Sequence, residues 1–268
     1  MKIVGSNILI TGASGGIGGA ISRQLAKQGA SLVLVSRDDD SLQKMGRELR
    51  DSGNNAIAIT CDLGQAGQPA ALIEEALKRR GGIDILINCA GIQNFGFFAD
   101  EKPADTEALF TVNTMVPIAL INAVLPHMLA KGSGRIVNVG SIFGSIGFPC
   151  FAAYSASKFA LRGFSEALRR ELASSGVGVT YVAPRFTRTP FNRGPVTRMA
   201  EILKMNQDDP ERVARQVVSA IENDGRDRYL GWPEKIFVRI NSILPRLVDA
   251  SLIKQVELMR PFATESTR

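Results

Sequence analysis

The stretch NILITGASGGIG, residues Asn7–Gly18, joins a short apolar run to a glycine-rich turn. A helical pattern over Ile17–Gln28 follows, so the turn lies between a predicted strand and a predicted helix. Glycines at such a place let the backbone turn tightly and approach a pyrophosphate, whose charge meets the N–H groups at the start of the helix. The stretch therefore predicts a dinucleotide-binding βαβ unit. The chain has no GxxxxGK[ST] run, which disfavours a nucleoside triphosphatase.

Outward from this unit, short β-branched runs alternate with helix-length segments, which predicts a parallel sheet covered on both faces. The expected class is α/β, a doubly wound Rossmann-type sheet in one domain, residues 1–234, with a helical appendage, residues 235–268. The expected strands are Asn7–Ile10, Ser31–Val35, Ala56–Thr60, Ile83–Ile87, Arg135–Val139, Val177–Val182 and Arg228–Leu230. The expected helices are Ile17–Gln28, Ser41–Ser52, Pro69–Arg80, Thr106–Leu129, Tyr154–Ser174 and Pro210–Asn223.

Composition narrows the class of protein. The chain has 268 residues, of which 45% are hydrophobic, 22% charged and 6% aromatic, as expected of an ordered globular chain. The net charge of +6 suggests an anionic ligand, and the scarcity of aromatic residues argues against nucleic acid. Two uncharged stretches, Ala108–Ala130 and Ile136–Ser157, are interrupted by Asn, Pro, Gly or Ser, so we expect core or subunit-interface segments rather than membrane spans.

Cysteine and histidine usage argues against a metal site. Cys61, Cys89 and Cys150 lie far apart and form no CxxC pair, so neither a disulfide framework nor a metal is expected. The single histidine, His127, excludes mechanisms that need two and is expected to be structural. No signal peptide precedes the first strand, and we therefore expect a cytoplasmic protein.

The end of the second strand bears on the choice of dinucleotide. It reads Val35-Ser36-Arg37, a small hydroxyl followed by a guanidinium that can bind a phosphate bidentately. A carboxylate there would bind a free ribose 2′-hydroxyl instead. The sequence favours NADP(H) over NAD(H). The run Asp38-Asp39-Asp40 could supply such a carboxylate, which leaves NAD(H) open as the alternative. The other interpretation of this run is that it forms the acidic start of the next helix.

Candidate catalytic residues follow the fifth and fourth strands. Tyr154 and Lys158 are four residues apart and hence on one helix face, where the ammonium would pull the phenol pKa down toward neutrality. Ser141 comes just after the fifth strand and can donate to a carbonyl oxygen. Pro117 lacks the N–H that would bond the carbonyl of Asn113, which frees that oxygen to hold a water and predicts a kinked helix.

In this order and spacing the motifs resemble the short-chain dehydrogenase/reductase family, and its NADP-preferring members in particular. The resemblance covers about residues 5–232 and rests on Thr11–Gly18, Asn88-Cys89-Ala90-Gly91, Asn113, Ser141 and the Tyr154/Lys158 pair. It implies that Tyr154 is the general acid in reduction and the base in oxidation, that Lys158 binds the nicotinamide ribose, that Ser141 orients the carbonyl and that Asn113 anchors a relay water.

The resemblance also implies cofactor contacts and assembly. A homodimer or homotetramer is expected, formed through the helices that hold Asn113 and Tyr154. The cofactor contacts would be Gly12, Ser14, Gly16, Ile17, Gly18, Arg37, Asp62, Leu63, Asn88, Ala90, Tyr154, Lys158, Pro184 and Thr189. The chain departs from the family pattern at Cys89, usually Asn, at Arg185, usually Gly, and in its longer C-terminal end.

The substrate is less determined. Apolar residues near the strand ends suggest a hydrophobic ketone or aldehyde, or the matching secondary alcohol; 3-ketoacyl thioester reduction and a non-catalytic NADP-binding regulator are the alternatives. The pocket is expected to include Phe95, Ile142, Phe148 and Phe191, with Phe97, Phe98, Phe143 and Phe151 nearby. Arginines after Pro184 are expected to form either a solvated basic face or a site for an anionic group: Arg185, Arg188, Arg193 and Arg198.

The C-terminal tail has apolar residues at helical spacing with basic residues among them, and Pro245 divides it. Packing on the substrate lid or on a partner subunit is one interpretation. The other interpretation is that the tail attaches the protein peripherally to the anionic inner face of a membrane.

Overall fold

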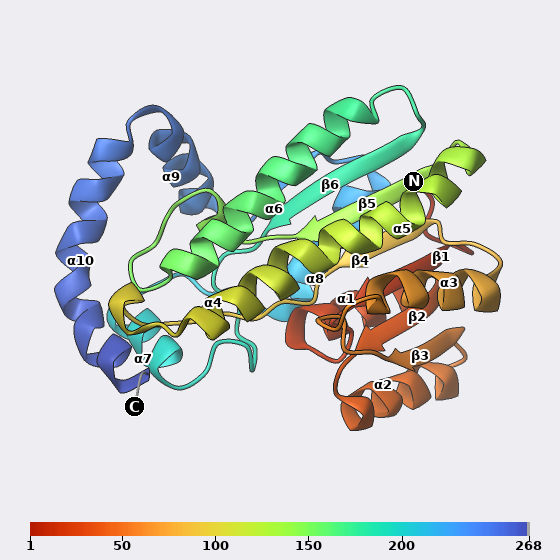
Figure 1. The fold of residues 1–268 in the computed structure, drawn as a ribbon, viewed down its shortest axis with the longest axis horizontal. Coiled ribbons are helices and arrows are strands. Elements are labelled where there is room, and N and C mark those ends of the chain that lie inside the picture. Colours follow the sequence, from red (N-terminus) through yellow and green to blue (C-terminus); the bar gives the residue numbers. More distant parts are fainter. Residues whose placement is uncertain (267–268) are drawn as a thin grey trace.

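A computed structural model describes residues 1–266. Seven parallel strands form one sheet, with helices on both faces, and the chain ends in two further helices (Figure 1). The strands are β1 (Asn7–Thr11), β2 (Ser31–Ser36), β3 (Ala56–Thr60), β4 (Ile85–Asn88), β5 (Gly134–Val139), β6 (Val177–Ala183) and β7 (Asp227–Tyr229). The helices are α1 (Gly16–Lys27), α2 (Asp39–Asp51), α3 (Gln68–Arg80), α4 (Pro103–Phe110), α5 (Val116–Lys131), α6 (Ala152–Glu171), α7 (Pro195–Ile202), α8 (Pro210–Glu222), α9 (Trp232–Ile243) and α10 (Pro245–Ser266).

The strand order is β3-β2-β1-β4-β5-β6-β7, which confirms the doubly wound Rossmann-type sheet. The chain reverses its direction of winding between β1 and β4, and in such sheets a ligand binds beyond the carboxyl ends of the strands at this point. All seven predicted strands and the six predicted helices are present, and most boundaries differ by one or two residues. The helix α7 was not among the predicted helices.

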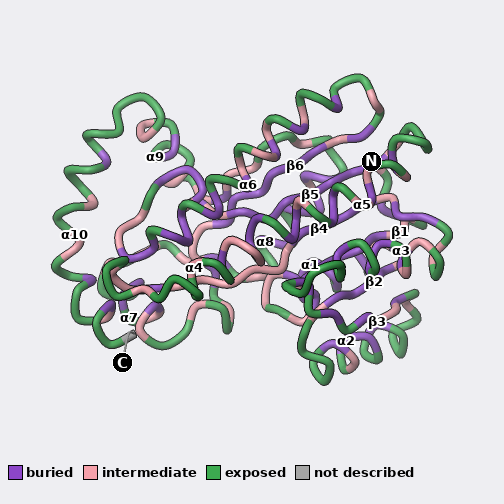
Figure 2. The backbone as a smooth tube through the Cα atoms, viewed as in Figure 1, coloured by how far each residue is buried: buried purple, intermediate pink, exposed green. Residues whose placement is uncertain are grey.

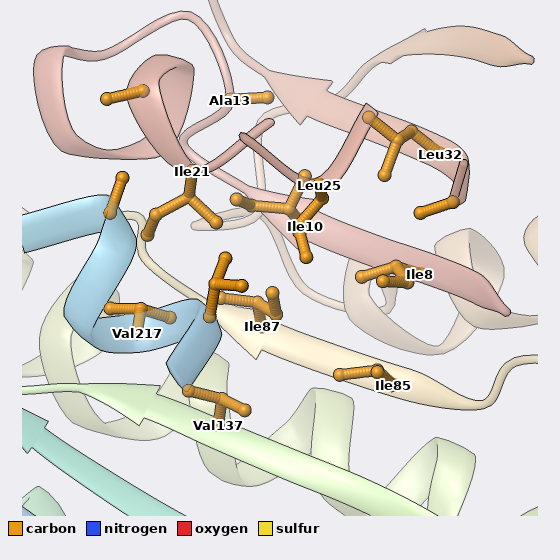
Figure 3. Packing of buried hydrophobic residues seen from close by; sticks show 14 of the residues in the cluster. Ile8, Ile10, Ala13, Ile21, Leu25, Leu32, Ile85, Ile87, Val137 and Val217 are labelled. Atoms are coloured by element: carbon orange, nitrogen blue, oxygen red, sulfur yellow. The ribbon is translucent and has the colours of Figure 1, made fainter. Parts of the chain in front are cut away.

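Side chains of the central strands alternate between two apolar layers. Ile8 and Ile10 point into the layer formed with α1, α2 and α8, while Leu9 between them belongs to the layer formed with α3, α5 and α6. Figure 3 shows the first layer, in which Ile21 of α1 and Val217 of α8 meet the strands. Because both faces are buried, these strands read as continuous apolar runs in the sequence.

The predicted helix Thr106–Leu129 is a longer helical segment, Pro103–Lys131, with a π-helical turn at Thr111–Met115. The turn is closed by a bond from the N–H of Val116 to the carbonyl of Thr111, just before Pro117, so the predicted irregularity is present. By length and composition the segment would suffice to cross a membrane, with a mean hydropathy of 1.8 in its most apolar window. In this fold 44% of that window is buried.

The last two helices lie at one end of the molecule, beside α7 (Figure 1). Their break at Pro245 was predicted. In α9, Val238 packs against Ile142 and Ile146, and at the far end of α10, Met259 packs among residues of α7. The predicted packing of the tail on the substrate lid, the segment after Pro184 that contains α7, is thereby confirmed. Most residues of the tail are nevertheless exposed (Figure 2).

Candidate active site

A cavity of about 830 Å³ lies at the carboxyl ends of the strands. It begins at the glycine-rich turn, passes the end of α6 that carries Tyr154, and reaches the inner sides of α7, α9 and α10. Its two parts differ in composition, and we call them the cofactor half, lined by residues of the segment 12–91, and the substrate half, lined by residues after 140. The predicted ligand position at the reversal of the sheet is thus a real cavity.

The cofactor half is a backbone cradle. Gly12 has a φ of 68°, which favours glycine, and its missing side chain leaves room for the backbone of Ala90, 2.9 Å from where a Cβ would stand. A Cβ on Gly18 would overlap the carbonyl oxygen of Gly12, and one on Gly16 would overlap Thr189. The turn leads directly into the N-terminus of α1, where free N–H groups attract an anion. The residues present therefore fit a dinucleotide pyrophosphate.

The end of β2 lines the same half. Ser36 and Ser14 share a hydrogen bond of 2.6 Å, and Arg37 lies beside them at the cavity wall. Asp38 also reaches this wall, but it is the N-cap of α2 and accepts from the N–H and the hydroxyl of Ser41. These bonds hold the pKa of Asp38 below its usual value. The interpretation of the acidic run as a helix start is confirmed.

The predicted adenine-side and central residues are placed unequally. Asp62 and Leu63 line the cavity, as does Ala90, whose N–H donates to Thr11 Oγ1 at 3.1 Å. Asn88 does not reach the cavity. It lies beneath, where Nδ2 donates to Asn138 Oδ1 at 2.8 Å, and its own Oδ1 is buried without a hydrogen-bond partner among the described residues.

Three of the four predicted catalytic residues face the cavity together: Tyr154, Lys158 and Ser141. The first two lie in the first turns of α6, with Lys158 Nζ 5.8 Å from the centre of the Tyr154 ring, and Lys158 Nζ donates to the carbonyl of Val139 at 3.4 Å. Ser141 follows β5, and its hydroxyl lies close enough to Tyr154 to oppose the rise of the Tyr154 pKa. The expected proton donor, Tyr154, and the expected carbonyl-orienting hydroxyl, that of Ser141, therefore lie close together at the cavity.

The acid–base balance differs from the sequence-based expectation. Burial raises the pKa of Tyr154 to about 12, opposed by its hydrogen bond to Ser141, whereas a lowered pKa was predicted. Burial also lowers the pKa of Lys158 to about 8, so the neighbouring cation is itself weakened. The reason is that both groups are buried, Tyr154 being 7% and Lys158 4% exposed, and desolvation penalises the phenolate and the ammonium alike. The protein thus holds Tyr154 as a protonated phenol at neutral pH.

Asn113 does not line the cavity but fixes a loop that does. It occupies the π-helical turn, where its side-chain oxygen accepts from the N–H of Ile92 at 2.9 Å and its Nδ2 donates to the Ile92 carbonyl at 2.8 Å. Nδ2 also lies 3.1 Å from Ser157 Oγ in α6. The side chain therefore joins the loop after β4 to the helix of Tyr154, while its carbonyl loses its usual donor at Pro117.

Apolar side chains make up most of the substrate half. Of the four predicted substrate residues, Ile142, Phe148 and Phe191 line it, whereas Phe95 lies behind Phe151, with ring centres 5.0 Å apart. Phe98 is exposed and does not line the pocket as suggested. Further lining residues, which were not predicted for the pocket, come from α7, α9, α10 and the segment before α8: Val196, Met199, Leu203, Met205, Phe237, Ile240, Leu247, Val248 and Leu252.

A signal for these residues was present in the sequence. Val196, Met199 and Leu203 recur at helical spacing in the segment after Pro184. Val248 and Leu252 lie one helical turn apart in the tail. That these faces meet around one cavity depends on contacts between distant segments.

The arginines after Pro184 differ in their surroundings: Arg188, Arg193 and Arg198 are exposed, as a basic face requires, whereas Arg185 is only partly exposed. Arg185 forms ion pairs with Asp208 at 3.0 Å and with Glu234 of α9 at 3.0 Å. Its φ is not positive, so this position needs no glycine. Two more are paired in the same way: Arg188 with Asp209 and Arg198 with Glu265. Through these ion pairs the segment after Pro184 is joined to other parts of the protein. Within residues 1–266, Arg193 alone of the four has no ion pair, and it lines the cavity near Thr189 and Pro184.

Tyr181 of β6 is a further residue near the site that was not predicted. It is fully buried, donates to the carbonyl of Ser141 at 3.2 Å and accepts from the N–H of Ser141 at 3.4 Å. Its ring fills the space that a Cβ on Gly140 would need. The phenol therefore fixes the backbone that carries the Ser141 hydroxyl.

Comparisons with known proteins agree with this arrangement. The family described as short chain dehydrogenase matches residues 6–199. A "Ketoacyl reductase HetN" from Nostoc sp. is 37% identical over 92% of this chain and 88% of its own, and a "3-ketodihydrosphingosine reductase" from Bos taurus is 34% identical over 81% and 69%. A Burkholderia phymatum short chain dehydrogenase/reductase solved with NAD has a TM-score of 0.86 at 25% identity, covering 92% of this chain and 96% of that one. A Burkholderia cenocepacia gluconate 5-dehydrogenase solved with NADP and tartrate has a TM-score of 0.78 at 28% identity, covering 85% and 95%. The chain belongs to the short-chain dehydrogenase/reductase family of oxidoreductases.

Proposed function

We propose that the protein is an NADPH-dependent carbonyl reductase that acts on hydrophobic ketones or aldehydes, and in reverse on the matching secondary alcohols. The observation that carries the proposal is the meeting of Tyr154, Ser141 and Lys158 at the junction between the glycine cradle and an apolar chamber. A protein that only binds a dinucleotide has no need of a phenol and a hydroxyl directed at one point.

The preference for NADPH rests on Arg37. With Asp38 engaged as the N-cap of α2, the group at the end of β2 that is free to meet a 2′-phosphate is a guanidinium, next to the hydroxyls of Ser36 and Ser14. Solved relatives contain either NAD or NADP, so the fold is compatible with both dinucleotides.

A bound nicotinamide supplies the hydride to the carbonyl carbon. Tyr154, protonated at neutral pH, donates its proton to the carbonyl oxygen, which becomes the alcohol hydroxyl. Ser141 donates a hydrogen bond to the same oxygen and orients it. Lys158 stabilises the phenolate left on Tyr154, and the water anchored beside Asn113 would return the proton from solvent. In the oxidative direction the phenolate accepts the alcohol proton.

The substrate class follows from the substrate half of the cavity. Its wall is apolar around the Tyr154 hydroxyl, with stacked Phe143 and Phe148 rings 4.5 Å apart, so burial of a hydrocarbon chain would supply the binding energy. A 3-ketoacyl thioester is the second candidate, because the relative from Nostoc carries the name ketoacyl reductase.

Assembly is proposed as a homodimer or homotetramer in the cytoplasm. The face formed by α5, the π turn and α6 leaves Met115 and Phe159 exposed, 58% and 39% respectively, on the helices that carry the site. Burial of these side chains against a second copy would remove apolar surface from water.

The decisive measurement is the oxidation rate of NADPH and of NADH with a series of hydrophobic ketones and a 3-ketoacyl thioester, repeated with Tyr154→Phe. We expect turnover with NADPH that falls by about 10²- to 10⁴-fold in the variant. Equal rates with NADH would contradict the assignment of Arg37. Tight NADPH binding with no turnover of any carbonyl would instead indicate a regulatory NADP-binding protein.

A further inference from the structure

We propose that the helix pair α9–α10 docks on an anionic lipid surface, and that a long-chain carbonyl compound enters the cavity from that surface. The second part rests on the proposed reductase function; the first does not. The inference comes from three independent features of the residues after Gly231: exposed apolar side chains, unpaired cations, and the opening of the cavity between the two helices.

The exposed apolar side chains of the protein are concentrated in the tail. Of the fifteen large hydrophobic residues that are exposed in the described chain, eight lie in α9, α10 and the turn between them. Trp232 and Ile243 are 74% and 75% exposed, and they share one face of α9 with Ile236, since residues four and seven apart align on a helix. The eight are Trp232, Ile236, Phe237, Ile243, Leu244, Leu247, Ile253 and Leu258, which we call the tail patch.

The charges around the tail patch are unbalanced in one direction. Three of the four carboxylates of α9 and α10 are neutralised: Glu234 pairs with Arg185, Glu257 with Arg260 and Glu265 with Arg198. Asp249 has no ion pair within the described residues. The exposed cations that lack an ion pair in this part of the structure are Lys235, Arg239, Arg246 and Lys254. Four unpaired cations beside an apolar stripe are complementary to anionic headgroups over acyl chains.

The cavity opens toward the tail patch. Phe237 of α9 and Leu247 of α10 both line the cavity, yet they are 50% and 62% exposed, so they form its rim on this side. On α10, Val248, Ser251 and Leu252 also line the cavity. A hydrocarbon chain in a bilayer on which the patch rests could therefore move into the substrate half through this rim and stay out of water.

A second copy of the chain suits this surface less well. In a twofold contact through α9, the four unpaired cations of one subunit would face those of the other, and one unpaired carboxylate on each side could not offset them. An anionic bilayer pairs with every cation and accepts the apolar side chains at once. We therefore assign the patch to a lipid surface.

Trp232 is the only tryptophan of the chain, so its fluorescence reports directly on the tail. Full-length protein would be titrated with phosphatidylcholine vesicles that contain phosphatidylglycerol, and with vesicles of phosphatidylcholine alone. We expect a shift of the emission to shorter wavelength and co-flotation with the anionic vesicles, both weakened by high salt. An unchanged spectrum and no flotation would overturn the proposal.

Two matched variants test the charges. The first neutralises the tail cations, with Lys235→Gln, Arg239→Gln, Arg246→Gln and Lys254→Gln; the control neutralises four exposed cations of α1, α2 and α3, with Lys27→Gln, Lys44→Gln, Arg47→Gln and Lys78→Gln. We expect vesicle binding to weaken by more than about tenfold in the first and by far less in the control. Equal losses would show a response to net charge alone and would overturn the assignment of the patch.

The entry route has a separate readout. With a long-chain methyl ketone carried in anionic vesicles, the tail variant should turn over at least about fivefold more slowly than the control variant, while both reduce a short water-soluble ketone equally. If wild-type protein reduced neither ketone, the proposed function would be contradicted. The test of vesicle binding would not be affected by that result. If Ile243→Asp turned an oligomer into a monomer and vesicles had no effect on wild type, the patch would be a subunit interface and the proposal would be wrong.

Discussion

The two halves of the cavity are built by different means. The cofactor half is built around backbone at strand ends, with glycines where a Cβ would collide with neighbouring atoms, and its residues come from the segment 12–91. The substrate half consists of side chains from the loop after β5, the segment after β6 and the helices α6, α7, α9 and α10, which are far apart in sequence. The first is determined by local motifs, whereas the second is determined by packing. A change in one half should therefore affect one ligand and spare the other.

The largest expected effect is at Gly18. In Gly18→Ala the new Cβ would overlap the Gly12 carbonyl, which should shift the turn and weaken NADPH binding by about 100-fold. Isothermal titration with NADPH measures it. Gly163→Ala is the matched control, because a Cβ there meets no atom within 4 Å and the residue is exposed in α6. Equal effects of the two substitutions would show that the close approach of Gly18 to the Gly12 carbonyl does not matter for binding.

Arg37→Ala should raise the KM for NADPH by about 10- to 100-fold, since a charge-assisted contact to a phosphate is lost. The KM for NADH and the KM for the ketone should both stay as they are, because Arg37 lies only at the cofactor half. Steady-state kinetics with both dinucleotides give the three values. A parallel rise in the KM for NADH would mean that Arg37 supports the fold and does not select the cofactor.

The pH profile tests the junction between the halves. The pKa of Lys158 is lowered to about 8, so its ammonium is present below that pH and is lost above it. The rate of ketone reduction should therefore fall by up to about tenfold between about pH 7 and about pH 9, while Tyr154, with its pKa raised to about 12, stays protonated. Lys158→Arg keeps a cation at all these values and should remove the fall in whatever activity remains. A wild-type profile that is flat to about pH 10 would refute the assignment.

The smallest effect is expected in the substrate half. Phe148→Ala removes a ring that stacks on Phe143, so the KM for a long hydrophobic ketone should rise by about five- to tenfold. The dissociation constant of NADPH should not change. A loss of NADPH affinity as large as the loss of ketone affinity would show that the halves are coupled, contrary to the comparison above.

The same contrast explains what the sequence could and could not predict. The seven strands, the phosphate turn and the positions of Tyr154, Lys158 and Ser141 depend on short-range patterns, and all were predicted. The pairing of Arg185 with Asp208 and Glu234 joins residues 23 and 49 positions apart, and no local pattern specifies it. The same holds for Tyr181, which contacts Ser141 across two neighbouring strands.

The sign of the Tyr154 pKa shift was missed for a related reason. A tyrosine four residues before a lysine indicates a nearby cation, but it does not reveal that both groups are buried. Enclosure results from the loops and helices packed around α6, and burial outweighs the charge of the neighbour.

The π-helical turn at Thr111–Met115 has a consequence for the phase of the long helix. Each residue advances a helix by about 100°, so removal of one residue from the turn would rotate all that precedes it by that angle relative to α5. The apolar stripe of α5 that includes Leu120 and Val124 would still face the sheet, but Asn113 could no longer face Ile92. A regular helix of this length could satisfy the core or the active site, and the one surplus residue lets it satisfy both.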